Sequence, residues 1–350
     1  MKKLLKILLC FLLVLAALAC ALILWLTVTE LKPAPVEDLE IKDFLDRELS
    51  PVGTELDILS WNIGYGGLGA GSDFFMDGGS QVRAADKATV ERYLAGIQDY
   101  LQANAPDLIM LQEVDIDSAR TYGINEANRL TRGVSVHALN YACDFVPFPW
   151  PPIGKVHSGL LTTTDHLIES AQRIALPCPF SWPVSAANLK RCLLVSTLPI
   201  EGSDSKLVLV NLHLEAYDDG EGKRAQTEQL KSFIQSEYEK GNYVIAGGDF
   251  NQVFPGSLEP YPIRLPELWE PGVLEDDMLP EGWRFAYDLS APSCRLLNQP
   301  YDPSDTANTQ HYVIDGFILS PNVELESVET VDLGFENSDH NPVRIHVTLN

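Results

Sequence analysis

Six short segments of this chain each place an acidic, amide or imidazole side chain where an apolar, strand-like run ends. They follow one another along the chain as Leu59-Ser60-Trp61-Asn62-Ile63, Leu111-Gln112-Glu113-Val114-Asp115, Asn211-Leu212-His213-Leu214, Gly247-Gly248-Asp249-Phe250-Asn251, Val313-Ile314-Asp315-Gly316-Phe317 and Ser338-Asp339-His340-Asn341-Pro342. A carboxylate at the end of a buried strand is costly unless it is paired or metal-bound. We therefore expect the six strand ends to meet in one acidic, histidine-flanked site.

The body of the chain alternates between strand-like and helix-like patterns from residue 56 onward. Helical periodicity is found at residues 89–103 and 224–239, and strand patterns are found at residues 56–60, 107–111, 134–142, 158–163, 192–196, 207–212, 243–246, 311–319, 323–331 and 343–349. Many strands with few helices favour stacked sheets with helices outside over a doubly wound parallel sheet. Residues from about 254 to 308 are rich in Pro, Gly and acidic residues, and they predict a long, partly ordered excursion.

The N-terminus has the pattern of a membrane anchor. Residues 1–6 carry Lys2, Lys3 and Lys6, and the next 22 residues, 7–28, are uncharged. As a helix this run is about 33 Å long, enough to span a bilayer core. The lysines predict a cytoplasmic N-terminus by the positive-inside rule. Residues 29–55 would then form a juxtamembrane linker that includes a short helix, and residues 56–350 an extracytoplasmic domain.

Two other interpretations of this N-terminus remain open. A cleaved signal peptide usually has an apolar stretch of only about 7–15 residues, shorter than this one. The segment Ala17-Leu18-Ala19-Cys20 loosely resembles a lipoprotein cleavage site, but the apolar run continues beyond it. An uncleaved anchor is therefore the favoured interpretation, with a signal peptide second and a lipoprotein third.

Composition bounds the class of protein. The chain has 350 residues, 45% of them hydrophobic, which is ample for one large domain or two small ones. Its 49 acidic residues outnumber 25 basic ones, for a net charge of -24. A protein that grips a nucleic-acid backbone usually shows a basic face, so this balance disfavours tight non-specific DNA binding. The body cysteines, Cys143, Cys178, Cys192 and Cys294, match no zinc spacing, and their disulfide state stays open.

The acidic strand ends have the chemistry of a site for a hard cation. Glu113 follows one buried strand, and Asp249 and Asn251 follow another, after Gly247-Gly248 lets the backbone turn. Oxygen ligands with few histidines favour Mg²⁺ or Mn²⁺ over zinc. The chain has no Ser or Cys in a nucleophile elbow, so attack by an activated water is the simpler chemistry.

Two histidines lie at strand ends among these acids, His213 and His340. His340 follows Asp339 directly, and Asp315 lies on a neighbouring predicted strand. A carboxylate that holds one imidazole nitrogen fixes the tautomer of the ring and keeps it charged or basic. Whether Asp249 or His340 serves as the base is not decided by the pattern.

In this order, the six segments resemble the endonuclease/exonuclease/phosphatase superfamily, whose members include DNase I-like nucleases. The resemblance covers residues 56–349. It implies an α+β fold, a four-layer α/β/β/α sandwich of two packed mixed β-sheets flanked by helices. It also implies a metal-dependent phosphoric ester hydrolase, either a phosphodiesterase or a phosphatase.

The resemblance also assigns roles to residues of this chain. The implied metal site consists of Glu113, Asn62 and Asp339. The implied catalytic residues are Asp249, His340, His213, Asp315 and Asn251. A further contact to the substrate phosphate is implied near His157, in the segment His157-Ser158-Gly159-Leu160-Leu161. The implied cofactor is Mg²⁺ or Mn²⁺, and the oligomeric state is left open.

Two features of the sequence outside these motifs limit the class of substrate. The chain has no run of Lys and Arg interleaved with aromatic residues, which is the pattern expected of a protein that tracks a DNA strand. Residues 145–153 are apolar and proline-rich, and they either contact a lipid interface or form a stiff packing loop. We therefore favour a lipid headgroup or a small organic phosphate as substrate. The alternatives are an extracytoplasmic nuclease and a catalytically silent binding module with the same fold.

Overall fold

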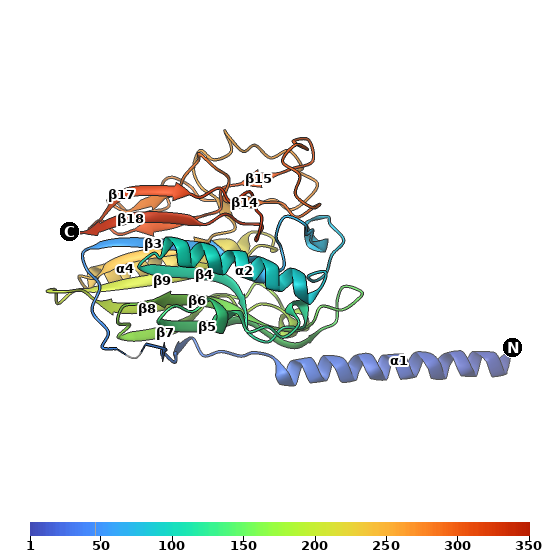
Figure 1. Cartoon of the computed structure of the whole chain (residues 1–350). Coiled ribbons are helices and arrows are strands. Elements are labelled where there is room, and N and C mark those ends of the chain that lie inside the picture. Colours follow the sequence, from blue (N-terminus) through green and yellow to red (C-terminus); the bar gives the residue numbers. More distant parts are fainter. Residues whose placement is uncertain (46) are drawn as a thin grey trace.

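Two seven-stranded sheets packed face to face form the body of the molecule (Figure 1). The computed structural model describes residues 1–45 and 47–350. In spatial order the first sheet contains β1 (Val36–Asp38), β7 (Ser170–Ala175), β8 (Cys192–Pro199), β9 (Lys206–His213), β10 (Tyr243–Asp249), β16 (Asp315–Leu319) and β13 (Arg284–Ala286). The second contains β17 (Val323–Thr330), β18 (Val343–Leu349), β3 (Glu55–Asn62), β4 (Leu108–Asp115), β6 (Gly154–Thr164), β5 (Val134–Val146) and β2 (Lys42–Asp43).

The remaining elements flank these sheets or connect their strands. The α-helices are α1 (Lys2–Thr29), α2 (Lys87–Asn104), α3 (Glu126–Leu130) and α4 (Glu221–Glu239). The 3₁₀ turns are η1 (Gly64–Gly66), η2 (Phe75–Asp77), η3 (Ala119–Thr121) and η4 (Val184–Ala187). Two short ladders pair β11 (Gln252–Val253) with β12 (Gly272–Val273) and β14 (Cys294–Arg295) with β15 (His311–Tyr312).

Both sheets are mixed, since β9 runs parallel to β10 and β3 runs parallel to β4 while their other neighbours are antiparallel. Successive side chains of a strand point to opposite faces, so each strand contributes apolar residues to two layers. Ile58 and Met110 of the second sheet belong to the same buried cluster as Leu209 and Ile245 of the first. This cluster is the central core of the domain.

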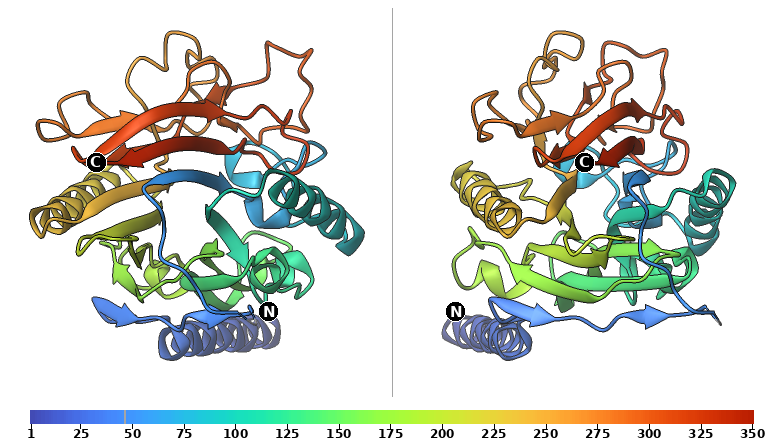
Figure 2. Two further views of the ribbon diagram at one scale, coloured as in Figure 1. Left: turned by 60° about the vertical axis from the view of Figure 1, so that its left-hand side comes forward. Right: turned by 90° about the vertical axis from the view of Figure 1, so that its left-hand side faces the viewer.

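Helices cover the outer faces of the sandwich, as Figure 2 shows for α2 and α4 on opposite sides. The buried stripe of α2, including Leu94 and Ile97, packs on the second sheet. Leu230 and Ile234 of α4 pack on the first sheet. The layers are therefore helix, sheet, sheet and helix, and the predicted four-layer α+β sandwich is confirmed.

A polar contact joins the two sheets inside this otherwise apolar core. The Gln112 side-chain amide donates to Asn211 Oδ1 at 2.9 Å, from β4 to β9. The Asn211 amide in turn donates to the carbonyl oxygens of Leu111 and Leu161, at 3.2 and 3.0 Å. Both side chains are fully buried. An unpaired polar group at this depth would be costly, so these bonds fix the position of one sheet relative to the other.

The segment before the domain differs from the prediction. Residues 29–55 were expected to form a linker with a short helix, whereas the structure has two short strands there. β1 extends the first sheet beside β7, and β2 extends the second beside β5. Each sheet edge offers unpaired backbone groups, and an extended segment running past them satisfies those groups better than a helix would.

Two further predictions change in detail. The excursion at 254–308 contributes β13 to the first sheet and β14 to a short ladder, so it is built into the domain. The strand predicted at 311–319 divides into β15 and β16, because Val313 and Ile314 between them are bonded elsewhere. The structure pairs none of the six cysteines, all of which lie in the part of the chain that it describes.

We expect Asn211→Ala to lower the free energy of unfolding by about 2–4 kcal/mol, because it leaves the buried Gln112 amide and two carbonyl groups without these partners. Urea denaturation of the purified protein measures this difference. Gln102→Ala, an exposed amide on α2, is the matched control and should change the value by less than about 0.5 kcal/mol. Equal values for the two variants would contradict a structural role for the bond between the sheets.

Candidate active site

The ends of four central strands place polar side chains at one edge of the sandwich. Asn62 ends β3 and Glu113 lies near the end of β4, next to each other in the second sheet. His213 ends β9 and Asp249 ends β10, and these two residues are directly paired in the first sheet. Because both strand pairs are parallel, their carboxyl ends lie level with one another. The topology thus brings four of the six segments to one edge of the sandwich.

Glu113 owes its direction to a break in the pairing of β4. The register between β4 and β6 shifts between Leu111 and Val114, and Glu113 has a φ of 57°. A β-bulge of this kind turns a side chain out of the alternation of the strand. A left-handed backbone is uncommon in a residue other than glycine, and such conformations concentrate at functional sites.

Asn62 bridges the two sheets at this edge. Its Nδ2 atom lies 3.3 Å from Glu113 Oε1 and 3.0 Å from Asp249 Oδ2. The Gly64 N–H donates to Asn62 Oδ1 at 3.0 Å and thereby fixes which way the amide faces. One side chain thus holds the two carboxylates of β4 and β10 at a set separation.

Asp249 is held by the chain on both sides of it. Gly248 passes so close to β9 that a Cβ atom there would lie 1.9 Å from the Leu212 carbonyl oxygen, so only glycine fits. The Asn251 N–H donates to Asp249 Oδ1 at 2.8 Å, and the Asn251 side chain donates to the Leu214 carbonyl at 2.9 Å. Asn251 also has a left-handed backbone, with a φ of 50°.

His340 forms a relay with Asp315 and Ser293. His340 Nδ1 lies 2.8 Å from Asp315 Oδ2, and the Ser293 hydroxyl donates to the same oxygen at 2.8 Å. Ser293 Oγ accepts from the backbone N–H groups of Ile314 and Asp315. The other ring nitrogen of His340, Nε2, is 3.8 Å from Asp249 Oδ2 and points toward the strand ends.

His213 and Asp339 complete the group. His213 Nε2 is 3.4 Å from Asp249 Oδ2. Asp339 Oδ2 is 3.9 Å from His340 Nε2, and its Oδ1 accepts from the Ser338 hydroxyl at 3.3 Å. Both side chains are buried. The site therefore contains two imidazoles and three neighbouring carboxylates that are shielded from bulk water.

Burial and mutual repulsion set the charges of these groups. Burial, and then the negative charge of Asp315, raises the pKa of Asp249 to about 6. Burial, with the charge of Glu113, raises the pKa of Asp339 to about 7. Burial alone would lower the pKa of His340, but Asp315 and its other acidic neighbours raise it well above its usual value. At neutral pH, Asp249 is thus mainly a carboxylate and His340 a cation.

The pKa of His213 moves the other way. Burial lowers it well below the usual value, and the positive charges of Arg191 and His340 lower it further. The His213 ring is therefore neutral at neutral pH. A neutral imidazole has one N–H that can donate to a phosphate oxygen and one nitrogen that accepts.

Two sets of atoms in this site are able to hold a cation. Ligand atoms of Asp249, Asp315 and His340 all lie within 4.8 Å of one another. In that set, however, His340 Nδ1 and Asp315 Oδ2 are already hydrogen-bonded to each other. The second set is the pair of carboxylates predicted as ligands, Glu113 and Asp339; the third predicted ligand, Asn62, turns its NH₂ group toward Glu113 and its Oδ1 toward the Gly64 N–H. The Glu113 carboxylate is half-buried, and among the described residues its hydrogen-bond partner is the Asn62 amide, which leaves its other oxygen available to a cation.

The predicted phosphate contact His157 stands apart from this group. His157 lies on β6, and its Nε2 atom is 3.8 Å from Asp144 Oδ1. Among the described residues, no hydrogen bond or ion pair joins the His157 ring to the other predicted site residues. All the other predicted residues are linked into one cluster by the contacts given above.

Sequence reasoning missed Ser293, which orients Asp315. Ser293 lies in the segment at 254–308, where no hydrophobic periodicity marks a strand. The sequence offered one sign of this role, a polar residue just before Cys294-Arg295, but a serine in a loop is too common to indicate a function. Its role depends on a contact between residues 22 positions apart, which no local pattern encodes.

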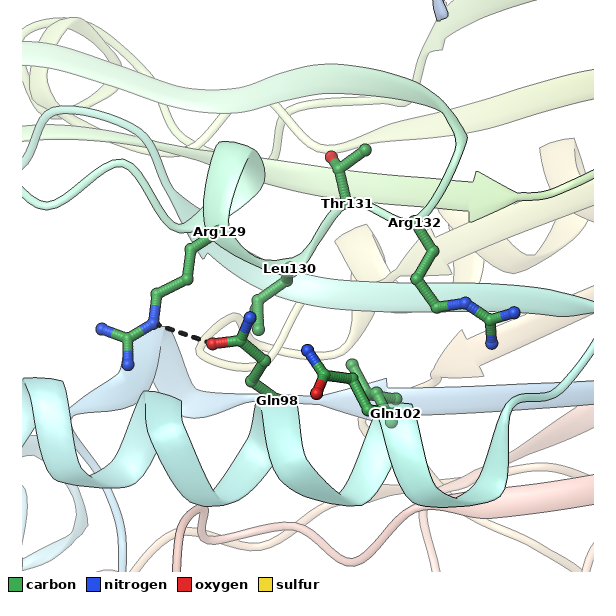
Figure 3. Close-up of a pocket in the computed structure, with 7 residues that line it drawn as sticks. Gln98, Gln102, Arg129, Leu130, Thr131 and Arg132 are labelled. Atoms are coloured by element: carbon green, nitrogen blue, oxygen red, sulfur yellow. Dashed lines mark hydrogen bonds between the residues drawn. The ribbon is translucent and has the colours of Figure 1, made fainter. Parts of the chain in front are cut away.

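A small cavity elsewhere has no such chemistry. It lies between α2 and residues 129–132 and has a volume of about 30 Å³ (Figure 3). Gln98, Gln102 and Arg129 are among its lining residues, and Arg129 Nε donates to Gln98 Oε1 at 3.4 Å. Its lining offers no carboxylate or imidazole, so the strand-end cluster is the candidate active site.

Comparison with solved structures shows similarity in fold. An endonuclease/exonuclease/phosphatase from Beutenbergia cavernae DSM 12333 matches with a TM-score of 0.54 and 16% identity, over 85% of this chain and 72% of the other. One from Bacteroides vulgatus matches with a TM-score of 0.51 and 15% identity, over 85% of this chain and 100% of the other. The human Nocturnin catalytic domain matches with a TM-score of 0.49 and 16% identity, over 89% and 97%.

No curated protein matches the sequence significantly. The model of the Endonuclease/Exonuclease/phosphatase family matches residues 59–340, a range that begins in β3 and ends at His340. This range contains every strand-end residue of the candidate site. The chain therefore belongs to the endonuclease/exonuclease/phosphatase family, whose members are phosphoester hydrolases.

Proposed function

We propose that this chain is a membrane-anchored phosphoesterase that uses a divalent cation to hydrolyse a phosphodiester or phosphomonoester by attack of water on phosphorus. The observation that carries the proposal is the pairing of Asp249, a carboxylate, with His340, a cation, whose facing atoms are 3.8 Å apart. A base and a positive charge whose facing atoms lie this close suit attack by a water on a phosphate group bound beside both of them.

In this mechanism each residue has one task. Asp249 Oδ2 accepts a proton from the attacking water, while the water oxygen forms a bond to phosphorus. Asn251 fixes Asp249 through its backbone N–H. His340 stabilises the charge that develops on the phosphate oxygens, and Asp315 keeps its ring protonated and oriented. His213 donates to a phosphate oxygen from the opposite side of Asp249.

The hydrolysis is completed when the P–O bond to the leaving group breaks, the leaving oxygen takes up a proton from solvent, and Asp249 returns to solvent the proton that it accepted. Glu113 and Asp339 would hold Mg²⁺ or Mn²⁺ beside this centre, and Asn62 would orient Glu113 through its NH₂ group. A bound divalent cation polarises the phosphate and neutralises the charge of the leaving oxygen. Hard carboxylate and amide oxygens suit such ions.

The anchor part of the proposal is supported by α1. This helix, Lys2–Thr29, is long and apolar enough to cross a membrane, and nearly all of its side chains are exposed. The three lysines at its start favour a cytoplasmic N-terminus and an extracytoplasmic catalytic domain.

Replacing either the proposed base, Asp249, or the protonated imidazole of His340 should abolish turnover. We expect Asp249→Asn and His340→Ala each to lower the rate of bis-p-nitrophenyl phosphate hydrolysis with Mg²⁺ or Mn²⁺ by at least about 100-fold. His346→Ala is the matched control, because this histidine is exposed and pairs with Asp57 at the start of β3, away from the site. A binding module without turnover would give no hydrolysis in any of the four proteins.

The two candidate cation sites make different predictions for binding. We expect Glu113→Gln to weaken Mn²⁺ binding at least about tenfold in calorimetric titration, because it removes a charged ligand. Asp315→Asn should leave Mn²⁺ affinity within about threefold while it lowers the hydrolysis rate. The reverse pattern, with Asp315→Asn losing the cation, would assign the ion to the Asp249, Asp315 and His340 set.

The pH dependence of hydrolysis distinguishes the two possible bases. If Asp249 accepts the proton, it must be ionised, so the rate falls as the pH drops below its pKa of about 6. A bound cation stabilises the carboxylate and moves this limb lower. If His340 were the base, its raised pKa would place the acid limb above pH 6.5. The position of the acid limb in the pH–rate profile, measured at saturating Mg²⁺, shows whether Asp249 or His340 is the base.

A further inference from the structure

Exposed apolar side chains lie in two loops of the domain whose neighbouring residues contact the end of α1. Phe148 and Trp150 lie in the β5–β6 loop, and Trp182 and Val184 lie in the β7–β8 loop; we call these four residues the aromatic collar. Trp150, Phe148 and Trp182 are 89%, 71% and 62% exposed, the highest values among the large apolar side chains described after α1. Such exposure at several neighbouring positions is unusual for a surface facing only water.

The collar is physically joined to α1. Leu22 and Leu26 of α1 pack in one cluster with Cys143 and Val146 of β5 and with Ala186 of η4. The Trp182 indole N–H donates to Thr27 Oγ1 at 3.0 Å, and Lys190 Nζ lies 2.8 Å from Glu30 Oε1. The helix therefore leaves the domain beside the collar, fixed by both apolar and polar contacts.

The length of α1 places the collar at membrane depth. Residues 7–21, the apolar part before the contacts with the domain begin, number 15 and span about 22 Å as a helix. A bilayer core is about 30 Å thick. The rest of the span must come from residues 22–26, which already touch the domain. The loops beside those residues then lie at the edge of the hydrocarbon layer, where Trp side chains are favoured.

The active site lies at this same edge of the domain. β6 runs antiparallel to β4, with Ser158 paired to Asp115, so the β5–β6 loop lies where β4 ends. β8 runs antiparallel to β9, with Leu193 paired to Leu212, so the β7–β8 loop lies where β9 ends. Figure 1 shows α1 leaving the domain on the side where the loop after β3 (blue) and the green loops project.

A chain of contacts connects the collar to the catalytic cluster. The rings of Phe148 and Phe75 meet edge to face, with centroids 6.2 Å apart. Phe75 begins η2, which ends at Asp77. Asp77 accepts a hydrogen bond from the Tyr217 hydroxyl at 2.8 Å, and Tyr217 lies four residues after His213 at the end of β9, so η2 is fixed to the strand-end edge that carries the site.

We propose that the aromatic collar docks into the bilayer leaflet beside α1, so that the active-site edge faces the lipid headgroups and the substrate is the phosphate ester of a membrane lipid. This inference rests on the proposed anchor and phosphoesterase activity. The acidic net charge of -24 means that docking depends on apolar insertion and not on attraction to anionic lipid. A nucleic-acid duplex, in contrast, would have to enter between the domain and the membrane.

Fluorescence quenching tests the docking directly. The full chain, carrying Trp25→Phe to remove the tryptophan of α1, is reconstituted into phosphatidylcholine vesicles with or without brominated acyl chains. We expect bromine to quench the emission, and Trp150→Phe to remove a large part of the quenched signal. Trp283→Phe is the matched control, since Trp283 packs against Tyr238 at the far end of α4. Equal quenching in the two variants would overturn the docking.

Lipid hydrolysis tests the substrate class. We expect the double variant Phe148→Asp and Trp150→Asp to lower phosphate-headgroup release from vesicles by at least about tenfold. The vesicles contain phosphatidylcholine, sphingomyelin, phosphatidylglycerol and phosphatidylinositol phosphate. Hydrolysis of soluble bis-p-nitrophenyl phosphate should stay within about twofold. Phe44→Asp, an exposed aromatic beside the start of β5 at the opposite edge, should leave both rates unchanged.

The quenching and hydrolysis experiments distinguish a failure of the docking proposal from a failure of the proposed phosphoesterase activity. Quenching with hydrolysis of the soluble diester but no headgroup release from any vesicle would overturn the lipid substrate. No hydrolysis of the soluble diester by the unmodified chain would refute the proposed phosphoesterase, while the quenching result would still decide whether the collar docks.

Discussion

The hydrogen bond between Gln112 of β4 and Asn211 of β9 is the constraint on which the site depends. It joins central strands of the two sheets through fully buried side chains, and a shift of one sheet against the other would break this bond and the bonds from Asn211 to Leu111 and Leu161. Glu113 follows Gln112 directly, and His213 lies two residues after Asn211. The bond therefore sets the distance between the carboxylate of one sheet and the imidazole of the other.

The strand ends of this arrangement hold strained backbone conformations and buried charges. Glu113 and Asn251 both have left-handed backbones, and Asp249 and Asp339 are buried acids with raised pKa values. The packed sandwich holds these conformations and charges in place. The charge repulsion that this creates is what a divalent cation and a protonated His340 would relieve.

Much of this architecture could be predicted from the sequence because it is written in local patterns. Four apolar runs end in a polar residue of the site, namely Asn62, Glu113, His213 and Asp249. Because the carboxyl ends of neighbouring parallel strands lie at the same edge of a sheet, these residues could be expected to meet. The excursion at 254–308 lacks such periodicity, so neither β13 nor the role of Ser293 could be foreseen. The edge strands β1 and β2 were missed because they are held by backbone groups, which leave little trace in side-chain pattern.

The central claim is that water, activated by Asp249, attacks the phosphorus atom of the substrate and not a carbon atom. Hydrolysis of bis-p-nitrophenyl phosphate in ¹⁸O-labelled water, in a single turnover with enzyme in excess, tests this by mass spectrometry of the products. We predict one ¹⁸O atom in p-nitrophenyl phosphate and none in p-nitrophenol. An unlabelled phosphate product with label in p-nitrophenol, which would indicate attack of water on the aryl carbon and cleavage of the C–O bond, would contradict the mechanism.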